Sequence, residues 1–186
     1  MFDVLIKSGL IIDGTGNIGF KGAVAIKKDR LKILKSDTSS IQAANIIDAS
    51  SFIVAPGFID AHSHSDLFAL SEPLNEVKIK QGICTEIIGL DGIGYAPLLK
   101  ENLQMMLLHH SGLNGYPELN YNWSSVAEYM QQFHHKTSGN IAFLIPNGCL
   151  RAETVGCEDR PATEVEISAM QDMIRQGMAE GAVGLS

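Results

Sequence analysis

The residues best placed to do chemistry together are His62 and His64, which lie two positions apart at the end of an apolar segment. Residues two apart on a strand project from the same face, and Asp60 shares that parity. Neutral imidazole nitrogen is a common zinc ligand, so the pair is a candidate metal site. The alternative is two polar side chains on a loop after a core strand. The spacing alone does not decide between them, because short histidine pairs also arise by chance.

The other four histidines form two adjacent pairs, His109 with His110 and His134 with His135. Adjacent residues point to opposite faces of a strand or about 100° apart on a helix. Neither pair therefore converges readily on one ion, and we expect both on a solvated surface.

Four further polar or reactive residues have structural explanations. Asp60 would orient a histidine or hold a strand end by local hydrogen bonds. Glu86 lies inside an apolar strand, and we expect its side chain to lean toward a helix that carries a paired cation. Arg151 would pin a loop or form a structural salt bridge. Cys84 reads as a buried small hydrophobe.

The amino-terminal part is composed of short β segments. A Ser-Gly pair separates the first two, and the charged stretch Lys27 to Arg30 is a hairpin turn between the next two. The expected strands cover residues 3–7, 10–13, 22–26, 31–34, 44–48 and 52–55.

From residue 55 the chain alternates apolar strands with helices. Two helices begin with capping-box spacing, Ser125 with Glu128 and Thr163 with Glu166. Strands are expected at residues 58–62, 84–89, 141–145 and 182–186, helices at 75–81, 125–135 and 163–180, and a polar and aromatic insertion at 95–123. Such alternation indicates a parallel sheet, either doubly wound or a (β/α) barrel. Residues 55–186 have room for about four β-α units, whereas a closed barrel takes about 250 residues.

Composition excludes several classes of protein. The chain has 186 residues, 45% of them hydrophobic, with 14 Lys plus Arg against 21 Asp plus Glu and a net charge of -7. This acidic balance does not favour nucleic acid as a partner. No apolar stretch approaches the roughly 20 residues of a membrane span, and an acid at Asp3 does not suit a signal peptide, so we expect a cytoplasmic protein without a membrane partner.

Several motifs in order resemble one enzyme family. The segment A-P-G-F-I-D-A-H-S-H at residues 55–64 resembles the first barrel strand of the amidohydrolase superfamily. Residues 81–98 look like the second strand and loop of its N-acyl-D-amino-acid deacylase (D-aminoacylase) branch. Residues 150–151 with 159–163, and 180–186, continue the similarity, which covers the whole chain.

The resemblance implies a fold and a metal site. It implies an α/β chain in which residues 55–186 form about the first four strands of an incomplete TIM (β/α) barrel, and residues 1–54 belong to a small composite β-sandwich. His62 and His64 fall on the family's first-strand metal ligands. Asp91 falls where many D-aminoacylases carry a cysteine that binds metal, and its alternative role is an ordinary Asp-Gly turn. Zn²⁺ or another divalent ion would be the cofactor. Asn147 stands where relatives often have a histidine.

The implied reaction is metal-dependent hydrolysis of the amide bond of a small N-acyl-D-amino acid. In the family, further histidine ligands and an aspartate that transfers protons come from later strands, which we expect beyond Ser186. The chain is therefore expected to be an amino-terminal fragment, inactive alone, that a complementing chain or self-association through the open barrel edge would complete. Two alternatives stay open: a non-catalytic remnant or association module, and a cyclic-amide hydrolase of the dihydroorotase or hydantoinase kind.

Overall fold

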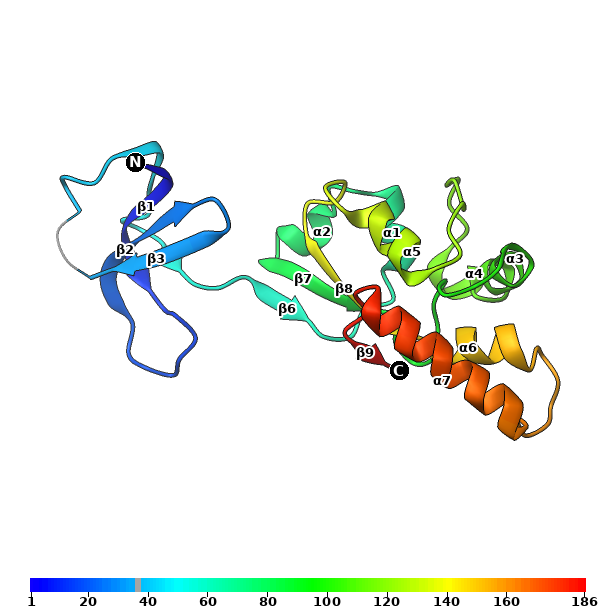
Figure 1. Cartoon of the computed structure of the whole chain (residues 1–186). Coiled ribbons are helices and arrows are strands. Elements are labelled where there is room, and N and C mark those ends of the chain that lie inside the picture. The colour runs from blue at the N-terminus through cyan, green and yellow to red at the C-terminus, as the bar shows by residue number, and fades with distance from the viewer. Residues whose placement is uncertain (36–37) are drawn as a thin grey trace. The chain divides into compact units, whose positions relative to one another are not determined.

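A computed structural model describes residues 1–35 and 38–186 (Figure 1). The chain divides into two compact units, Met1–Pro56 and Gly57–Ser186. Each unit has its own sheet and its own core.

The first unit is a mixed sheet. Its strands are β1 (Phe2–Ile11), β2 (Phe20–Lys27), β3 (Arg30–Leu34), β4 (Ala43–Asp48) and β5 (Ile53–Val54), in the order β3-β2-β1-β4 with β5 also beside β1. β2 and β3 pair in antiparallel fashion through Lys27 and Arg30, which confirms the predicted hairpin. β4 and β5 both run parallel to β1. Leu5, Ala23 and Ala25 form the small core of this unit.

The predicted break at Ser8-Gly9 is wrong, because β1 is one continuous strand. The pairing with β2 instead shifts register between Ile6 and Gly9, and Ser8 has a φ of 66°. These are features of a β-bulge, which bends a strand without ending it. A Cβ at Gly9 would lie 2.6 Å from Val54, so the absence of a side chain also lets β5 approach β1.

The second unit is a parallel sheet with helices between its strands, as predicted. The strands are β6 (Phe58–Asp60), β7 (Ile83–Ile88), β8 (Asn140–Ile145) and β9 (Gly184–Leu185), in that order across the sheet. The helices are α1 (Asp66–Ser71), α2 (Glu76–Ile79), α3 (Lys100–His109), α4 (Ser111–Asn114), α5 (Val126–Phe133), α6 (Asn147–Thr154) and α7 (Glu164–Ala179).

Both predicted capping boxes are present. The Ser125 hydroxyl accepts the Glu128 N–H at 3.1 Å, and the Thr163 hydroxyl accepts the Glu166 N–H at 3.3 Å. Each glutamate side chain in turn accepts the backbone N–H of the capping residue. These bonds satisfy amide groups that the first helical turn leaves unpaired, so α5 and α7 begin where the sequence predicts.

The region 95–123 is not an insertion outside the core. It contains α3 and α4, and Tyr95, Leu103, Leu107 and Trp123 are buried in the main core of this unit. The Trp123 indole N–H donates to the Tyr95 carbonyl oxygen at 2.8 Å. Leu103, Met106 and Leu107 have the i, i+3, i+4 spacing of an apolar helix face, which was the available signal.

The parallel sheet is uncovered at both edges in the part of the chain that the structure describes. No further strand pairs with the outer side of β6 or of β9 there. Phe58 and Ile59 on β6, and Leu185 on β9, are exposed apolar residues.

In the same described ranges, none of the helices has the length and apolar character that crossing a membrane requires.

Candidate metal centre

His62 and His64 lie in the loop that joins β6 to α1. The prediction that they end a strand is wrong, because β6 stops at Asp60. They nevertheless face one another, with ring centroids 5.5 Å apart in an edge-on arrangement. The position after the carboxyl end of a parallel strand is where α/β folds commonly place their ligands.

Asp91 meets both imidazoles. Its Oδ2 atom lies 3.1 Å from Nε2 of His62 and 3.2 Å from Nε2 of His64. The three ligand atoms all lie within 4.8 Å of one another. Across residues 1–35 and 38–186 this is the one group of three or more His, Cys, Asp or Glu side chains with such geometry. We call these three residues the metal cluster.

The metal cluster opens to solvent on one side. The side chains of His62 and Asp91 are 60% and 58% exposed, whereas that of His64 is 23% exposed. A small molecule can therefore reach the carboxylate and one imidazole, while the second imidazole is partly enclosed by protein.

Asp91 sits in a turn directly after β7. Asp91 and Gly92 have φ angles of 55° and 71°, in the left-handed region that aspartate tolerates better than most residues. The Asp-Gly turn and the contact with both histidines thus occur together, because the turn aims the carboxylate at the loop after β6.

Three strand ends hold this turn in place. The Ser186 hydroxyl donates to the Gly89 carbonyl oxygen at 2.5 Å and accepts the Gly92 N–H at 3.3 Å. The Gly148 N–H donates to the Gly92 carbonyl oxygen at 3.1 Å. A Cβ at Gly148 would lie only 2.3 Å from that oxygen, so glycine is required there. The ends of β7, β8 and β9 are therefore joined beside the metal cluster.

Asp60 and Glu86 stabilise the loop that carries His62 and His64. Asp60 accepts the His62 backbone N–H at 3.2 Å, and its other oxygen lies 2.5 Å from Nζ of Lys78. The hydrogen bond from Lys78 lowers the pKa of Asp60. Glu86 also pairs with Lys78, at 3.1 Å, which confirms the predicted cation on a neighbouring helix.

Asp66 is a buried carboxyl group that the sequence reading missed. It follows His64 by two positions at the start of α1, and burial raises its pKa to about 7. The Tyr129 hydroxyl donates to it at 3.4 Å, which connects α1 to α5. A polar residue that opens a helix and faces the core was the available signal.

Cys84 and His110 differ from their expected environments. Cys84 is exposed rather than buried, because it lies at the start of β7 beside the exposed edge strand. His110 is half-buried, and burial lowers its pKa, so it is not a surface residue. Of the two roles expected for Arg151, pinning a loop is confirmed, because its guanidinium donates to the carbonyl oxygens of Glu158 and Arg160, both at 2.7 Å. Among the described residues it forms no salt bridge.

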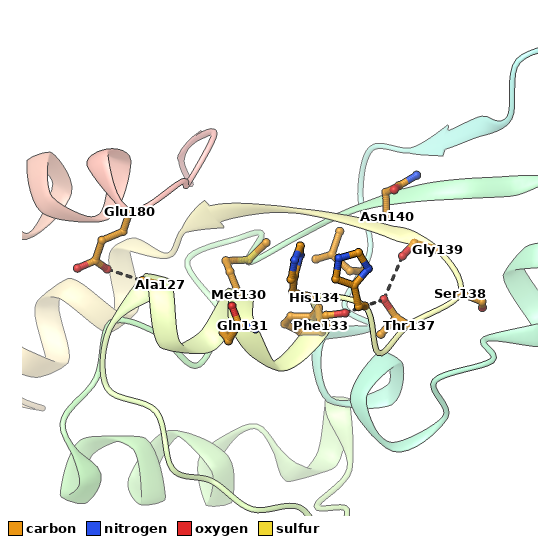
Figure 2. Close-up of a pocket in the computed structure, with 12 residues that line it drawn as sticks. Ala127, Met130, Gln131, Phe133, His134, Thr137, Ser138, Gly139, Asn140 and Glu180 are labelled. Atoms are coloured by element: carbon orange, nitrogen blue, oxygen red, sulfur yellow. Dashed lines mark hydrogen bonds between the residues drawn. The ribbon is translucent and has the colours of Figure 1, made fainter. Parts of the chain in front are cut away.

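His134 and His135 are exposed, as predicted, and line a separate cavity of about 600 Å³ (Figure 2). This cavity includes Asn140 at the first position of β8 and Glu180 after α7. Asp91 lies three residues beyond the last residue of β7, so in a parallel sheet the two features belong to opposite ends of the strands. The cavity is not part of the metal cluster.

Comparison with known proteins identifies relatives along the whole chain. No family model matches it. The D-aminoacylase of Alcaligenes xylosoxydans xylosoxydans is 34% identical over 188 residues, which cover 100% of this chain and 37% of the relative. The N-acyl-D-aspartate deacylase of the same organism is 30% identical over 185 residues, 99% of this chain and 36% of the relative.

Solved structures agree with this relationship. N-acyl-D-glutamate deacylase from Bordetella bronchiseptica, complexed with zinc and a phosphonate inhibitor that mimics the tetrahedral intermediate, has a TM-score of 0.82 and 31% identity. It matches 99% of this chain, which spans 38% of that protein. A D-aminoacylase structure has a TM-score of 0.81 and 30% identity, over 100% of this chain and 38% of its own.

The fold and its neighbours define the class. The structural neighbours are amidohydrolases with a TIM-barrel fold. Within that class, the chain is homologous over its whole length to the amino-terminal part of N-acyl-D-amino-acid deacylases, and it spans little more than a third of their length. An L-hydantoinase from Arthrobacter aurescens, at 18% identity and a TM-score of 0.53, shares the fold alone, so the cyclic-amide alternative is not favoured.

Proposed function

We propose that this chain forms the amino-terminal part of a metal-dependent hydrolase that cleaves the amide bond of N-acyl-D-amino acids. The observation that carries the proposal is that one carboxylate oxygen of Asp91 contacts Nε2 of both His62 and His64. The D-aminoacylase and N-acyl-D-aspartate deacylase named above support the substrate class.

The donor set of the metal cluster fits a divalent ion. Ligand atoms about 2.0 Å from a tetrahedral zinc ion are about 3.3 Å from one another. The separations of 3.1 and 3.2 Å between Asp91 Oδ2 and the two Nε2 atoms are close to that value. Two imidazoles with a carboxylate suit Zn²⁺ and also harder divalent ions. We therefore propose His62, His64 and Asp91 as ligands of Zn²⁺ or another divalent ion.

The three side chains would divide the work. A bound zinc ion supplies Lewis acidity at an amide carbonyl and lowers the pKa of water to about 7. Asp91 contributes the negative charge that offsets part of the charge of a divalent ion. His64, the less exposed imidazole, fixes one donor against protein, whereas exposed His62 and Asp91 leave room for a substrate to approach.

Amide hydrolysis also needs an acid for the leaving amine. By resemblance to the family, that acid is an aspartate, and further histidine ligands accompany it, on later barrel strands. We propose that β6 to β9 are about the first four strands of such a barrel, and that residues 1–54 contribute to a composite β-sandwich. The uncovered edges of β6 and β9 support this proposal, because further strands would pair there.

Metal content tests the proposed function. We expect the purified chain to retain zinc through dialysis and the His62→Ala/His64→Ala double variant to lose it. The matched control is His134→Ala/His135→Ala, which removes two exposed imidazoles away from the metal cluster and should leave zinc content unchanged. Elemental analysis after dialysis, alongside circular dichroism to verify folding, provides the measurement.

Two outcomes would contradict the proposal. Folded wild-type protein that holds no zinc would favour a non-catalytic remnant. Equal zinc retention in the wild type and in the His62→Ala/His64→Ala variant would move the ion away from the metal cluster.

A further inference from the structure

Glu86 is a buried carboxylate in the middle of a largely apolar strand. It lies in β7 and is 3% exposed. Its Oε2 atom accepts the hydroxyls of Ser63 at 3.1 Å and Ser65 at 2.7 Å, and lies 3.1 Å from Nζ of Lys78. Its Oε1 atom accepts the Asn75 side-chain amide. We call these five residues the Glu86 cluster.

The partners of Glu86 alternate in sequence with the proposed metal ligands. In the segment His62-Ser63-His64-Ser65, the two serines are buried and point toward Glu86. The two histidines, which alternate with them, contact Asp91. Two hydroxyls on one carboxylate therefore fix one side of this loop segment. The opposite side is left to present the two imidazoles.

Lys78 connects the cluster to the backbone of the first ligand. Its Nζ atom lies between Glu86 and Asp60 and also donates to the Ser63 hydroxyl at 3.2 Å. Asp60 in turn accepts the His62 backbone N–H. One ammonium group thus links β6, the histidine loop and β7, from its place on α2.

A buried carboxylate costs free energy unless its charge and oxygens are satisfied. Here both oxygens have donors, and a cation lies beside them. Because both oxygens of Glu86 are satisfied, a rearrangement of Ser63, Ser65 or Lys78 would leave that buried carboxylate without a donor, and this holds the three partners in one geometry. An apolar side chain would fill the same strand position but would not grip the two serines.

We propose that the Glu86 cluster positions His62 and His64 for metal binding, an inference that rests on the proposed function of the metal cluster. Ser63, Ser65 and Glu86 act as positioning residues, and they touch neither the ion nor a substrate. Residues that hydrogen-bond directly to metal ligands typically contribute about 10- to 100-fold to metal affinity. We take that range as the expected effect of the Glu86 cluster, which acts on the loop backbone between the ligands.

Co²⁺ binding provides the test, because its visible absorption reports coordination geometry as well as affinity. We expect Ser63→Ala/Ser65→Ala and Glu86→Gln each to weaken Co²⁺ binding about 10- to 100-fold and to change the spectrum. Ser63→Thr/Ser65→Thr, which keeps both hydroxyls, should recover most of the affinity.

Matched controls separate positioning from general stability. Glu76→Gln removes an exposed glutamate of α2, the helix that carries Lys78, and breaks its pair with Lys80 at the helix end; it should leave Co²⁺ affinity unchanged. Ser111→Ala removes a serine hydroxyl that donates to the Leu108 carbonyl oxygen elsewhere in the unit, with the same expectation. The unfolding temperature of every variant is measured in parallel.

The outcomes are distinguishable. If the wild type binds Co²⁺ through His62 and His64 but the cluster variants keep its affinity and spectrum, the cluster is only structural and the inference is wrong. If the wild type binds no Co²⁺, or the His62→Ala/His64→Ala variant binds it equally, the proposed function fails and this inference fails with it. Should Glu86→Gln not fold, the serine variants and their threonine rescue decide.

Discussion

Asp91 combines a strained backbone with the central position in the metal cluster. Its φ of 55° lies where most L-residues are disfavoured, and asparagine and aspartate are the side chains that best tolerate it. In many D-aminoacylases a cysteine occupies this position, by the resemblance described above. Substitution of the Asp91 carboxylate therefore tests how the metal affinity of the cluster depends on the type of ligand at this position.

Replacing Asp91 with asparagine should weaken metal binding with little effect on folding. Asparagine keeps the shape and the left-handed conformation but removes the negative charge, so we expect at least a 10-fold loss of zinc affinity. Isothermal titration of wild type and Asp91→Asn measures it, with Asp159→Asn at an exposed turn as the control. Unchanged affinity would remove Asp91 from the ligand set.

For single residues, the sequence predicts the kind of partner that a side chain has better than it predicts the burial of that side chain. The cation beside Glu86 and the surface location of His134 and His135 are confirmed. The burial of Cys84 is wrong, because the exposure of a strand residue depends on what covers that face of the sheet. No local pattern contains that information.

Helix starts are the best-predicted features at the scale of secondary structure. A capping box is local, since it links residues three apart, and both predicted boxes are present. The sequence does not predict α1, α3, α4 or α6, and the two longest of these are α3 and α6. α6 begins directly after Pro146, without a side-chain cap, and α3 has none either. Their formation depends on burial of Leu103, Leu107 and Leu150 in the shared core.

Glu166, a member of the α7 capping box, gives a pH-dependent test of the bonds that it makes with Arg160 and Thr163. Hydrogen bonds from Arg160, together with those from Thr163, lower the pKa of Glu166 to about 2. Because an unfolded glutamate has a pKa of about 4.3, the stabilisation is fully present above that pH and is lost as pH falls through about 2.

We therefore expect Glu166→Gln to lower stability at pH 7 and to flatten the loss of stability between pH 5 and pH 2. The effect is modest because the group is accessible to solvent. Urea unfolding at a series of pH values measures it. Glu164→Gln, in the same first turn, is the control. Parallel pH profiles for wild type and Glu166→Gln would show that Glu166 carries no such linkage.

At the scale of the whole molecule, the metal cluster depends on the order of the strands in the parallel sheet. His62 and His64 follow β6, whereas Asp91 follows β7, and these two strands are neighbours and parallel. Their carboxyl ends therefore meet at one edge of the sheet. The same order leaves the outer sides of β6 and β9 without a partner strand among the described residues.

We expect the purified chain alone to hydrolyse N-acetyl-D-methionine no faster than a metal-free control. Within the described residues there is one ligand group, and the proposed acid and further histidines would come from later strands. Adding the part of a related D-aminoacylase that this chain does not cover should restore turnover if strands pair at the open edges. Amino acid release, followed by chromatography, measures both.

Robust turnover by the chain alone would contradict this expectation, and would assign the proton transfer to residues already present. The His62→Ala/His64→Ala variant serves as the control in both arms, since turnover that survives it does not use the metal cluster.

Local sequence was sufficient to predict the alternation of strands and helices, the hairpin, both capped helix starts and the two histidines as a pair. These features depend on residues a few positions apart, whose periodicity and hydrogen bonding act within one element. The contact of Asp91 with both imidazoles, the continuous β1 and the network around Glu86 required the folded chain. The contacts of Asp91 and the bonds from Ser63 and Ser65 to Glu86 join residues more than twenty positions apart, and only the packing of β6 beside β7 brings these groups within hydrogen-bond distance. The continuity of β1 depends instead on its pairing with β2, β4 and β5.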